Sequence, residues 1–90
     1  MSSDLGMRRR RALWRATHRG SKEMDFLLGR FAERALDAMN ASEIAVFERL
    51  IEVPDPKIES CVLEGHSLGE RDLDELIVRL RRFHGLEPAG

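Results

Sequence analysis

Apolar residues recur at intervals of three and four along most of this chain, which is the spacing of one face of a helix. The pattern is strongest over residues 24–39, where it predicts an amphipathic helix of about five turns. Ser21 is placed to cap the first turn of that helix. No stretch alternates apolar and polar residues as a strand does, and no internal repeat or sustained heptad is present. The apolar stripe of this helix consists of Met24, Leu27, Leu28, Phe31, Ala35 and Met39.

A shorter helix is predicted before this one and another directly after it. Residues 8–18 have a helical pattern that Gly20 ends. The later helix begins at Asn40 or Ser42, because Asn40 and Glu43 have the spacing of a capping box while Ser42 competes for the cap. The apolar faces of these two helices carry Leu13, Ala16 and Thr17, with Trp14 close beside them, and Ile44, Phe47 and Ile51.

Pro54 separates the third helix from two further ones. Asp55 is predicted to cap the fourth helix, with Pro56 at its first position and Gly65 at its end. Residues 65–70 are rich in glycine and predict a loop before the fifth helix. The inner faces comprise Ile58, Cys61 and Val62 in the fourth helix, and Leu73, Leu76, Ile77, Leu80 and Phe83 in the fifth, which Gly85 and Pro88 close.

Five short helices with short connections predict an all-α fold, a compact single-domain bundle. The 90 residues of the chain suffice for one modest core that buries about 60–65 % of the unfolded chain's surface. We place the helical domain at residues 8–85. A disordered N-terminal tail is expected at residues 1–7 and a C-terminal tail at residues 86–90.

The composition is 42 % apolar and 34 % charged, which agrees with a folded helical protein. The apolar runs are far shorter than the roughly 20 residues that a membrane span needs, so we expect no membrane insertion. Cys61 is the one cysteine, and its place on an apolar stripe predicts inert packing. With no second thiol and no secretory leader, we expect a reduced, intracellular protein of the bacterial cytoplasm.

Charge is unevenly distributed along the chain. Residues 1–22 hold seven Lys and Arg against Asp4 alone, whereas residues 23–90 hold eight against fifteen acids. Such polarity can steer the encounter with a partner of patterned charge. The run from Arg8 to Arg11 leaves open an alternative function, a general helical adaptor or a nucleic-acid-associated protein. One tryptophan, no tyrosine and an acidic remainder offer no stacking platform, so we expect no nucleic-acid partner.

No set of residues has the spacing of a catalytic or metal site. His18 lacks a carboxylate or nucleophile at a recognisable spacing, and His66 and His84 are too far apart for a local metal site. No glycine-rich turn follows a strand, as a dinucleotide site requires. We therefore expect no catalytic residue, no metal and no tightly bound cofactor.

Polar residues between the first two helices are placed where neither packing nor solubility requires them. Gly20 ends the first helix, and Glu23 falls in the first turn of the next, where the helix dipole favours negative charge. Together with Arg19, this pattern predicts an exposed cation and an exposed anion side by side.

The arrangement R-G-x-x-E-x-D at residues 19–25 is followed by F-L-L-G-R-F-A at residues 26–32. It resembles the small assembly-factor family that promotes covalent flavin attachment to the flavoprotein subunit of succinate dehydrogenase. The correspondence covers nearly all of residues 8–83, with continuous agreement from Trp14 to Ala32, and it is thin in the last helix. Cys61 stands where relatives usually carry a tryptophan, and Ser21 where threonine or methionine is expected.

The resemblance implies a chaperone without catalytic residues, which assists the autocatalytic flavinylation of its partner. The partner would be the flavoprotein subunit of succinate dehydrogenase (respiratory complex II), with the related fumarate reductase a further candidate client. A histidine of the partner attacks FAD in this family's chemistry, so FAD belongs to the partner.

The family motif also implies which residues bind the partner. Arg19 and Glu23 would make charge-assisted contacts at the interface, and Gly20 would let the two backbones approach closely. We expect a monomer when the protein is free. The further partner-binding candidates on the same surface are Arg15, His18, Lys22 and Asp25.

Overall fold

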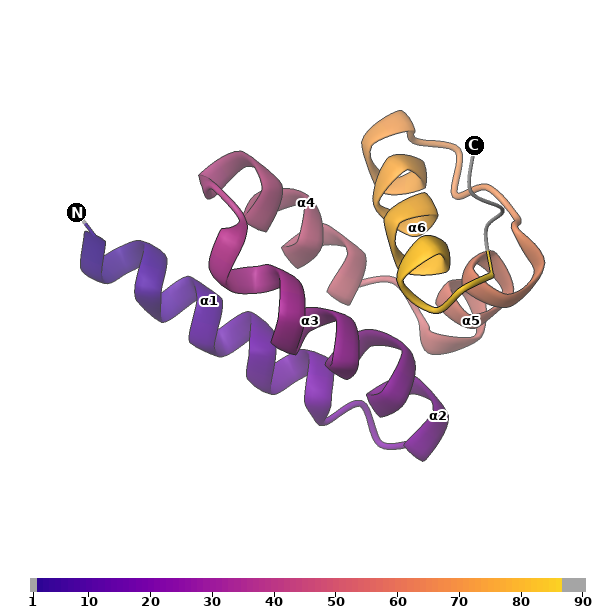
Figure 1. Cartoon of the computed structure of the whole chain (residues 1–90), viewed down its shortest axis with the longest axis horizontal. Coiled ribbons are helices and arrows are strands. Elements are labelled where there is room, and N and C mark those ends of the chain that lie inside the picture. The colour runs from indigo at the N-terminus through magenta and orange to yellow at the C-terminus, as the bar shows by residue number, and fades with distance from the viewer. Residues whose placement is uncertain (1, 87–90) are drawn as a thin grey trace.

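The computed structural model describes residues 2–86, and helices form most of this range (Figure 1). They are α1 (Ser2–Thr17), α2 (Lys22–Met24), the π-helix η1 (Asp25–Gly29), α3 (Arg30–Ala35), the 3₁₀-helix η2 (Leu36–Ala38), α4 (Ala41–Ile51), α5 (Asp55–Glu64) and α6 (Arg71–Phe83). Residues 2–86 contain no strand. The prediction of an all-α fold is confirmed.

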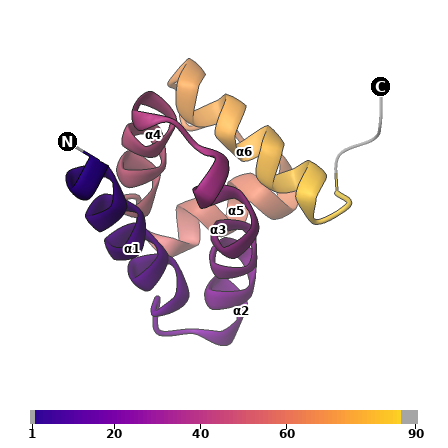
Figure 2. The same ribbon diagram turned by 60° about the vertical axis from the view of Figure 1, so that its left-hand side comes forward.

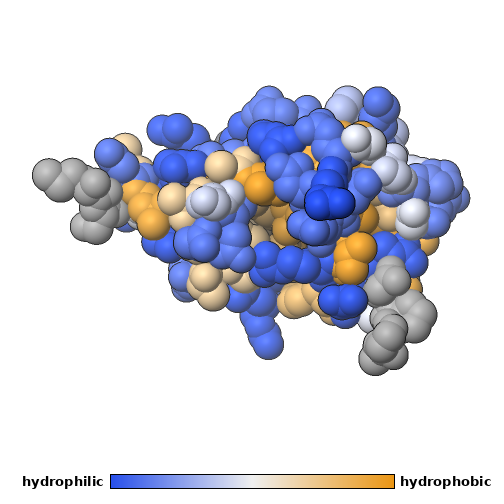
Figure 3. Space-filling view, turned by 90° about the horizontal axis from the view of Figure 1, so that it is seen from above, coloured by the Kyte–Doolittle hydropathy of each residue, from blue (hydrophilic) through white to orange (hydrophobic). Residues whose placement is uncertain are grey.

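The helices pack around one hydrophobic core. α1 lies against η1, α3 and α4, while α6 packs against α4 and α5 (Figures 1 and 2). The largest fully buried side chains include Phe47, Leu28 and Met39, which belong to the predicted stripes. Phe83 is 42 % exposed at the end of α6, so its predicted place in the core is wrong. Hydrophilic residues cover most of the face seen from above (Figure 3).

α1 is longer than predicted. A disordered tail over residues 1–7 was expected, but residues 2–7 form the first turns of the helix, and residue 1 lies outside the described residues. Asp4 lies in the first turn, where it complements the helix dipole. Leu5 packs against the core, and this burial accounts for the additional helix that the short N-terminal pattern did not indicate.

Two arginines of the basic run tie α1 to the rest of the fold. Arg8 Nη2 lies 2.7 Å from Glu48 Oε1 on α4. Arg9 donates from Nε to the Leu36 carbonyl at 3.1 Å and from Nη2 to the Met39 carbonyl at 2.7 Å. Leu36 begins the 3₁₀-helix over residues 36–38 and Met39 follows it, so Arg9 ties α1 to both ends of this turn. The Leu36 carbonyl also accepts from the Met39 amide at 3.1 Å. The run is therefore not a uniform basic face.

The Arg8–Glu48 pair makes stability depend on pH. The hydrogen bond from Arg8 holds the pKa of Glu48 below its usual range. Its stabilising contribution is present above the unfolded pKa of about 4.3 and is lost as the pH falls through the lower folded pKa. We expect Glu48→Gln to lower the urea midpoint slightly at neutral pH and to match the wild type in acid. Glu33→Gln, at an exposed position, is the control for the loss of one charge.

The helix predicted over residues 24–39 begins as expected, but its later part is not a continuous α-helix. Ser21 caps it by accepting a hydrogen bond from the Met24 amide at 3.2 Å. A continuous α-helix was expected, whereas residues 25–29 form a π-helix and residues 36–38 a 3₁₀ turn. Gly29 allows this segment to approach α1, because a Cβ there would lie 3.0 Å from Thr17 Cγ2 and 3.3 Å from the Ala16 carbonyl oxygen.

The predicted ends of the third and fourth helices are partly confirmed. Asn40 and Glu43 form the capping box, each side chain accepting from the other's amide at 2.9 Å. Gly65 ends α5 with φ +77°. The cap of α5 is Pro54, and Asp55 is the first helical residue, so the prediction of Asp55 as the cap is wrong. The Asp55 carboxylate instead accepts hydrogen bonds from a distant arginine, described below.

The chain continues past α6 for a few described residues. Gly85 has φ +72°, as expected of a residue that closes a helix. The Leu86 amide donates to the Arg81 carbonyl at 2.7 Å, so the first residue of the predicted C-terminal tail is still attached to α6. Pro88 and the rest of that tail lie outside the described residues.

Candidate functional site

The loop over residues 18–21 connects α1 to α2 and has Gly20 at its exposed tip. Gly20 has φ +100°, a conformation that residues with a Cβ rarely adopt. No heavy atom lies within 4 Å of the position a Cβ would take. The backbone conformation therefore favours glycine, and the space around it is open to another molecule.

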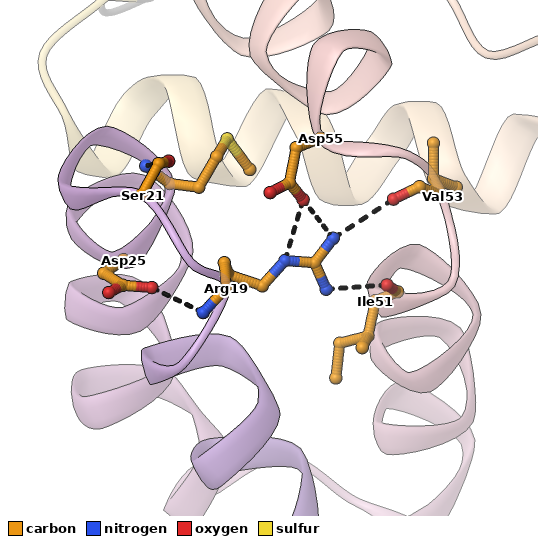
Figure 4. A network of polar contacts seen from close by, with 7 residues as sticks. Arg19, Ser21, Asp25, Ile51, Val53 and Asp55 are labelled. Atoms are coloured by element: carbon orange, nitrogen blue, oxygen red, sulfur yellow. Dashed lines mark hydrogen bonds and ion pairs between the residues drawn. The ribbon is translucent and has the colours of Figure 1, made fainter.

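Arg19 points away from the open side of this loop, into the corner between α4 and α5 (Figure 4). Its Nε donates to Asp55 Oδ1 at 2.9 Å, its Nη1 to the Ile51 carbonyl at 2.7 Å and its Nη2 to the Val53 carbonyl at 3.2 Å. Nη2 also pairs with Asp55. The Arg19 side chain is only 10 % exposed. The prediction that Arg19 is an exposed cation is wrong, because the end of α4 leaves carbonyls that its guanidinium satisfies.

Asp25 fixes the same loop from the other side. Its Oδ1 accepts a hydrogen bond from the Arg19 backbone amide at 2.6 Å (Figure 4). Asp25 is half-buried at the start of η1. The structure thus places Asp25 as an anchor of the loop.

Glu23 is exposed, as predicted, but it does not lie in a pair with Arg19. Its neighbour is Glu59 on α5, and a hydrogen bond in which the protonated Glu59 carboxyl donates to Glu23, together with burial, raises the pKa of Glu59 above its usual range. Asp55 adds to this effect through its negative charge. The open surface between Gly20 and α5 is therefore acidic, because Glu23, Glu59 and Asp55 lie close together there. The charge pattern of the sequence did not indicate this.

The remaining candidates surround the loop on α1 and α2. His18 and Lys22 are exposed, and Arg15 pairs with Glu52, the residue that caps the end of α4. The His18 ring stacks on Trp14, with ring centroids 4.3 Å apart and an interplanar angle of 12°. This stack borders a shallow hollow of about 210 Å³, also lined by Arg15, Arg19 and Asp55. A tryptophan and a histidine four residues apart share one helix face, so the sequence does contain the signal for this stack.

Trp14 is the most exposed of the large hydrophobic residues in the described range, at 61 %. From the sequence, Trp14 was expected beside the apolar face of the first helix, and it was not among the expected partner-binding residues. A large exposed aromatic side chain adjoining an open loop is typical of a protein interface. The structure therefore adds Trp14 to the candidate surface.

The other titratable groups do not form a second site. Cys61 is buried, and desolvation raises the pKa of its thiol, as inert packing requires. Within residues 2–86, no three His, Cys, Asp or Glu residues gather as metal ligands would. None of the helices in that range is long and apolar enough to cross a bilayer.

The model of the family described as "Flavinator of succinate dehydrogenase" matches residues 10–84, a range that includes the whole site. This chain belongs to that family. An FAD assembly factor SdhE of Acetobacter pasteurianus is 36 % identical over 77 residues, which are 86 % of this chain and 71 % of that protein. Another FAD assembly factor SdhE, from Legionella pneumophila, is 30 % identical over 71 residues, which are 79 % of this chain and 87 % of that protein.

A eukaryotic relative matches as well. The mitochondrial succinate dehydrogenase assembly factor 2 of Dictyostelium discoideum is 26 % identical over 88 residues, which are 98 % of this chain and 62 % of that protein. No solved structure matches this chain. The resemblance inferred from the residues around Gly20 is confirmed.

Proposed function

We propose that this protein binds the flavoprotein subunit of succinate dehydrogenase and promotes the covalent attachment of FAD to a histidine of that subunit. The observation that carries the proposal is the family match over residues 10–84. Two bacterial relatives are named as FAD assembly factors, and this supports the same role here. The related fumarate reductase is a further candidate client.

The protein acts on the conformation of its partner and leaves the bond-forming step to the flavoprotein and FAD. The reacting histidine and the electrophilic flavin need only be held in alignment. A preference of about 3 kcal/mol for the aligned conformation shifts its population roughly a hundredfold. No catalytic group and no tightly bound cofactor are needed in the helper, and FAD stays with the partner.

The surface around Gly20 suits this role. Gly20 has open space on its outer side, so a backbone segment of the flavoprotein can approach closely. The exposed side chains of Trp14, His18, Lys22 and Glu23 surround this point. An aromatic anchor within a polar rim is the usual composition of an energetically important interface. We place the contact with the flavoprotein here.

We also propose that the protein works as a monomer in the bacterial cytoplasm. The polarity between its basic first helix and its acidic remainder would speed the encounter with a partner of patterned charge.

Co-purification tests the choice of partner. The tagged protein is co-expressed with the flavoprotein subunit, and we expect the two to elute together at moderate salt. The alternative function, association with nucleic acid through the arginine run, predicts bound nucleic acid that dissociates steeply with salt. The engagement of Arg8 and Arg9 in the fold favours the first result. Nucleic acid in place of flavoprotein would contradict the proposal.

A further inference from the structure

We propose that Asp55 is a positioning residue for flavinylation, and that Arg19 acts through Asp55 and the α4–α5 corner without touching the flavoprotein. This inference rests on the proposed function. It assigns a role to a residue outside the motif and changes the role of one within it.

The contacts of Arg19 leave little for a partner to bind. All three of its side-chain nitrogens donate hydrogen bonds, and they use the Asp55 carboxylate and the carbonyls of Ile51 and Val53. Its side chain is 10 % exposed, while that of Asp55 is 30 % exposed. Turning Arg19 outward would leave these acceptors without their donor in a partly buried place, which is costly.

The network joins the loop to the opposite half of the molecule. The other polar contacts of residues 18–21 stay on α1, α2 and η1 throughout the described range: His18 lies 2.8 Å from the Trp14 carbonyl, the Arg19 amide donates to Asp25, and Ser21 caps Met24. Only the Arg19 side chain reaches the α4–α5 corner (Figure 4). Asp25 and Ser21 hold the loop to its own half of the molecule, and the Arg19 side chain holds it to the α4–α5 corner.

Asp55 is well placed to hold the connection. It is the first residue of α5, so its charge is favoured by the helix dipole, and it faces both Nε and Nη2 of Arg19. The carbonyls of Ile51 and Val53 orient the guanidinium of Arg19 but carry no negative charge. Removing the carboxylate leaves Arg19 with weaker neutral acceptors, and the loop gains alternative orientations.

This mechanism has a distinct kinetic consequence. If only a fraction of molecules present the loop correctly, the apparent affinity for the flavoprotein falls by that fraction while the bound complex still works. We expect Asp55→Ala to raise the concentration needed for half-maximal flavinylation about tenfold, with a maximal rate close to that of wild type. Circular dichroism and thermal unfolding establish that the variant is folded.

Asp72→Ala is the matched control. Asp72 lies in the first turn of α6 and pairs with Arg49 of α4, as Asp55 pairs with Arg19 across the other corner. The control removes a carboxylate from the first turn of a helix at a distance from the loop. If Asp55→Ala loses no more activity than Asp72→Ala, the positioning role is wrong.

A double-mutant cycle separates positioning from direct contact. Wild type, Arg19→Ala, Asp55→Ala and the double variant are titrated into the flavoprotein subunit with FAD, and covalent flavin is measured. If both residues act through one network, the double variant is no worse than the more impaired single variant. If Arg19 contacts the flavoprotein independently of Asp55, the two losses multiply, and that result would overturn the inference.

The same experiment distinguishes a failure of the proposed function from a failure of the role proposed for Asp55. Should the alanine variants fail to fold, the cycle is measured with Asp55→Asn, which keeps side-chain volume, and Arg19→Gln, which keeps a polar but shorter side chain. Both substitutions remove charge, and the same criteria apply. A wild-type protein that does not stimulate flavinylation contradicts the proposed function itself. A stimulating wild type with multiplying losses contradicts only the role of Asp55.

Discussion

Replacing Gly20 with arginine is expected to abolish covalent flavin attachment to the partner while the helical bundle stays folded. A residue with a Cβ at φ +100° is strained, at about 1–2 kcal/mol, which is small against a typical stability of about 5–15 kcal/mol. No atom of the protein lies within 4 Å of the new Cβ. The arginine side chain therefore projects from the loop tip, where it prevents the flavoprotein backbone from approaching.

Gly69→Arg is the matched control for this substitution. Gly69 lies in the loop before α6, has φ +83° and also has no atom within 4 Å of a Cβ. The two variants therefore carry similar backbone strain and the same added charge at different places. Flavin fluorescence of the partner in a denaturing gel should vanish with Gly20→Arg and persist with Gly69→Arg. Equal fluorescence with both variants would remove Gly20 from the interface.

Replacing Leu28 with alanine is expected to cause the largest loss of stability among single truncations considered for this fold. Leu28 lies in η1, is fully buried and belongs to the hydrophobic core. Deleting the buried side-chain atoms removes their transfer free energy and leaves a cavity, at a cost of about 2–5 kcal/mol. Urea denaturation monitored by circular dichroism measures this loss.

Leu63→Ala provides the comparison at an exposed leucine. Leu63 is 50 % exposed on α5, so its truncation should change the free energy of unfolding by no more than about 0.5 kcal/mol. Under conditions in which the variant is still folded, Leu28→Ala should promote flavinylation, because the Gly20 surface is unaltered. A stability loss as small as that of Leu63→Ala would mean that the core is assigned incorrectly.

The helices and most of the core could be predicted from the sequence because their determinants are local. The side chains of Ser21 and Asn40 each cap a helix by accepting from an amide three residues further along the chain. The spacing of apolar residues alone identifies the stripe that contains Leu28. Helix capping and periodicity act over one or two turns, so a single sequence contains the whole signal.

The position of the candidate site could be predicted from its motif, but the roles of its charged residues could not. Arg19 was expected to face a partner and instead contacts Asp55, 36 residues further along the chain. Arg8 belongs to the basic run, and no pattern in the sequence indicated its pairing with Glu48, 40 residues away. Such pairs depend on how the helices pack, and the spacing of residues within one helix contains no information about them. For the same reason, the sequence did not indicate that Glu23 lies close to Glu59.

Reconstitution with purified components tests the central claim most directly. The flavoprotein subunit of succinate dehydrogenase, prepared without covalent flavin, is incubated with FAD in the presence or absence of this protein. Covalent flavin is then followed over time after denaturation. We predict that attachment is much faster with the protein present, and that Gly20→Arg removes the difference. Equal rates with and without the wild-type protein would contradict the account.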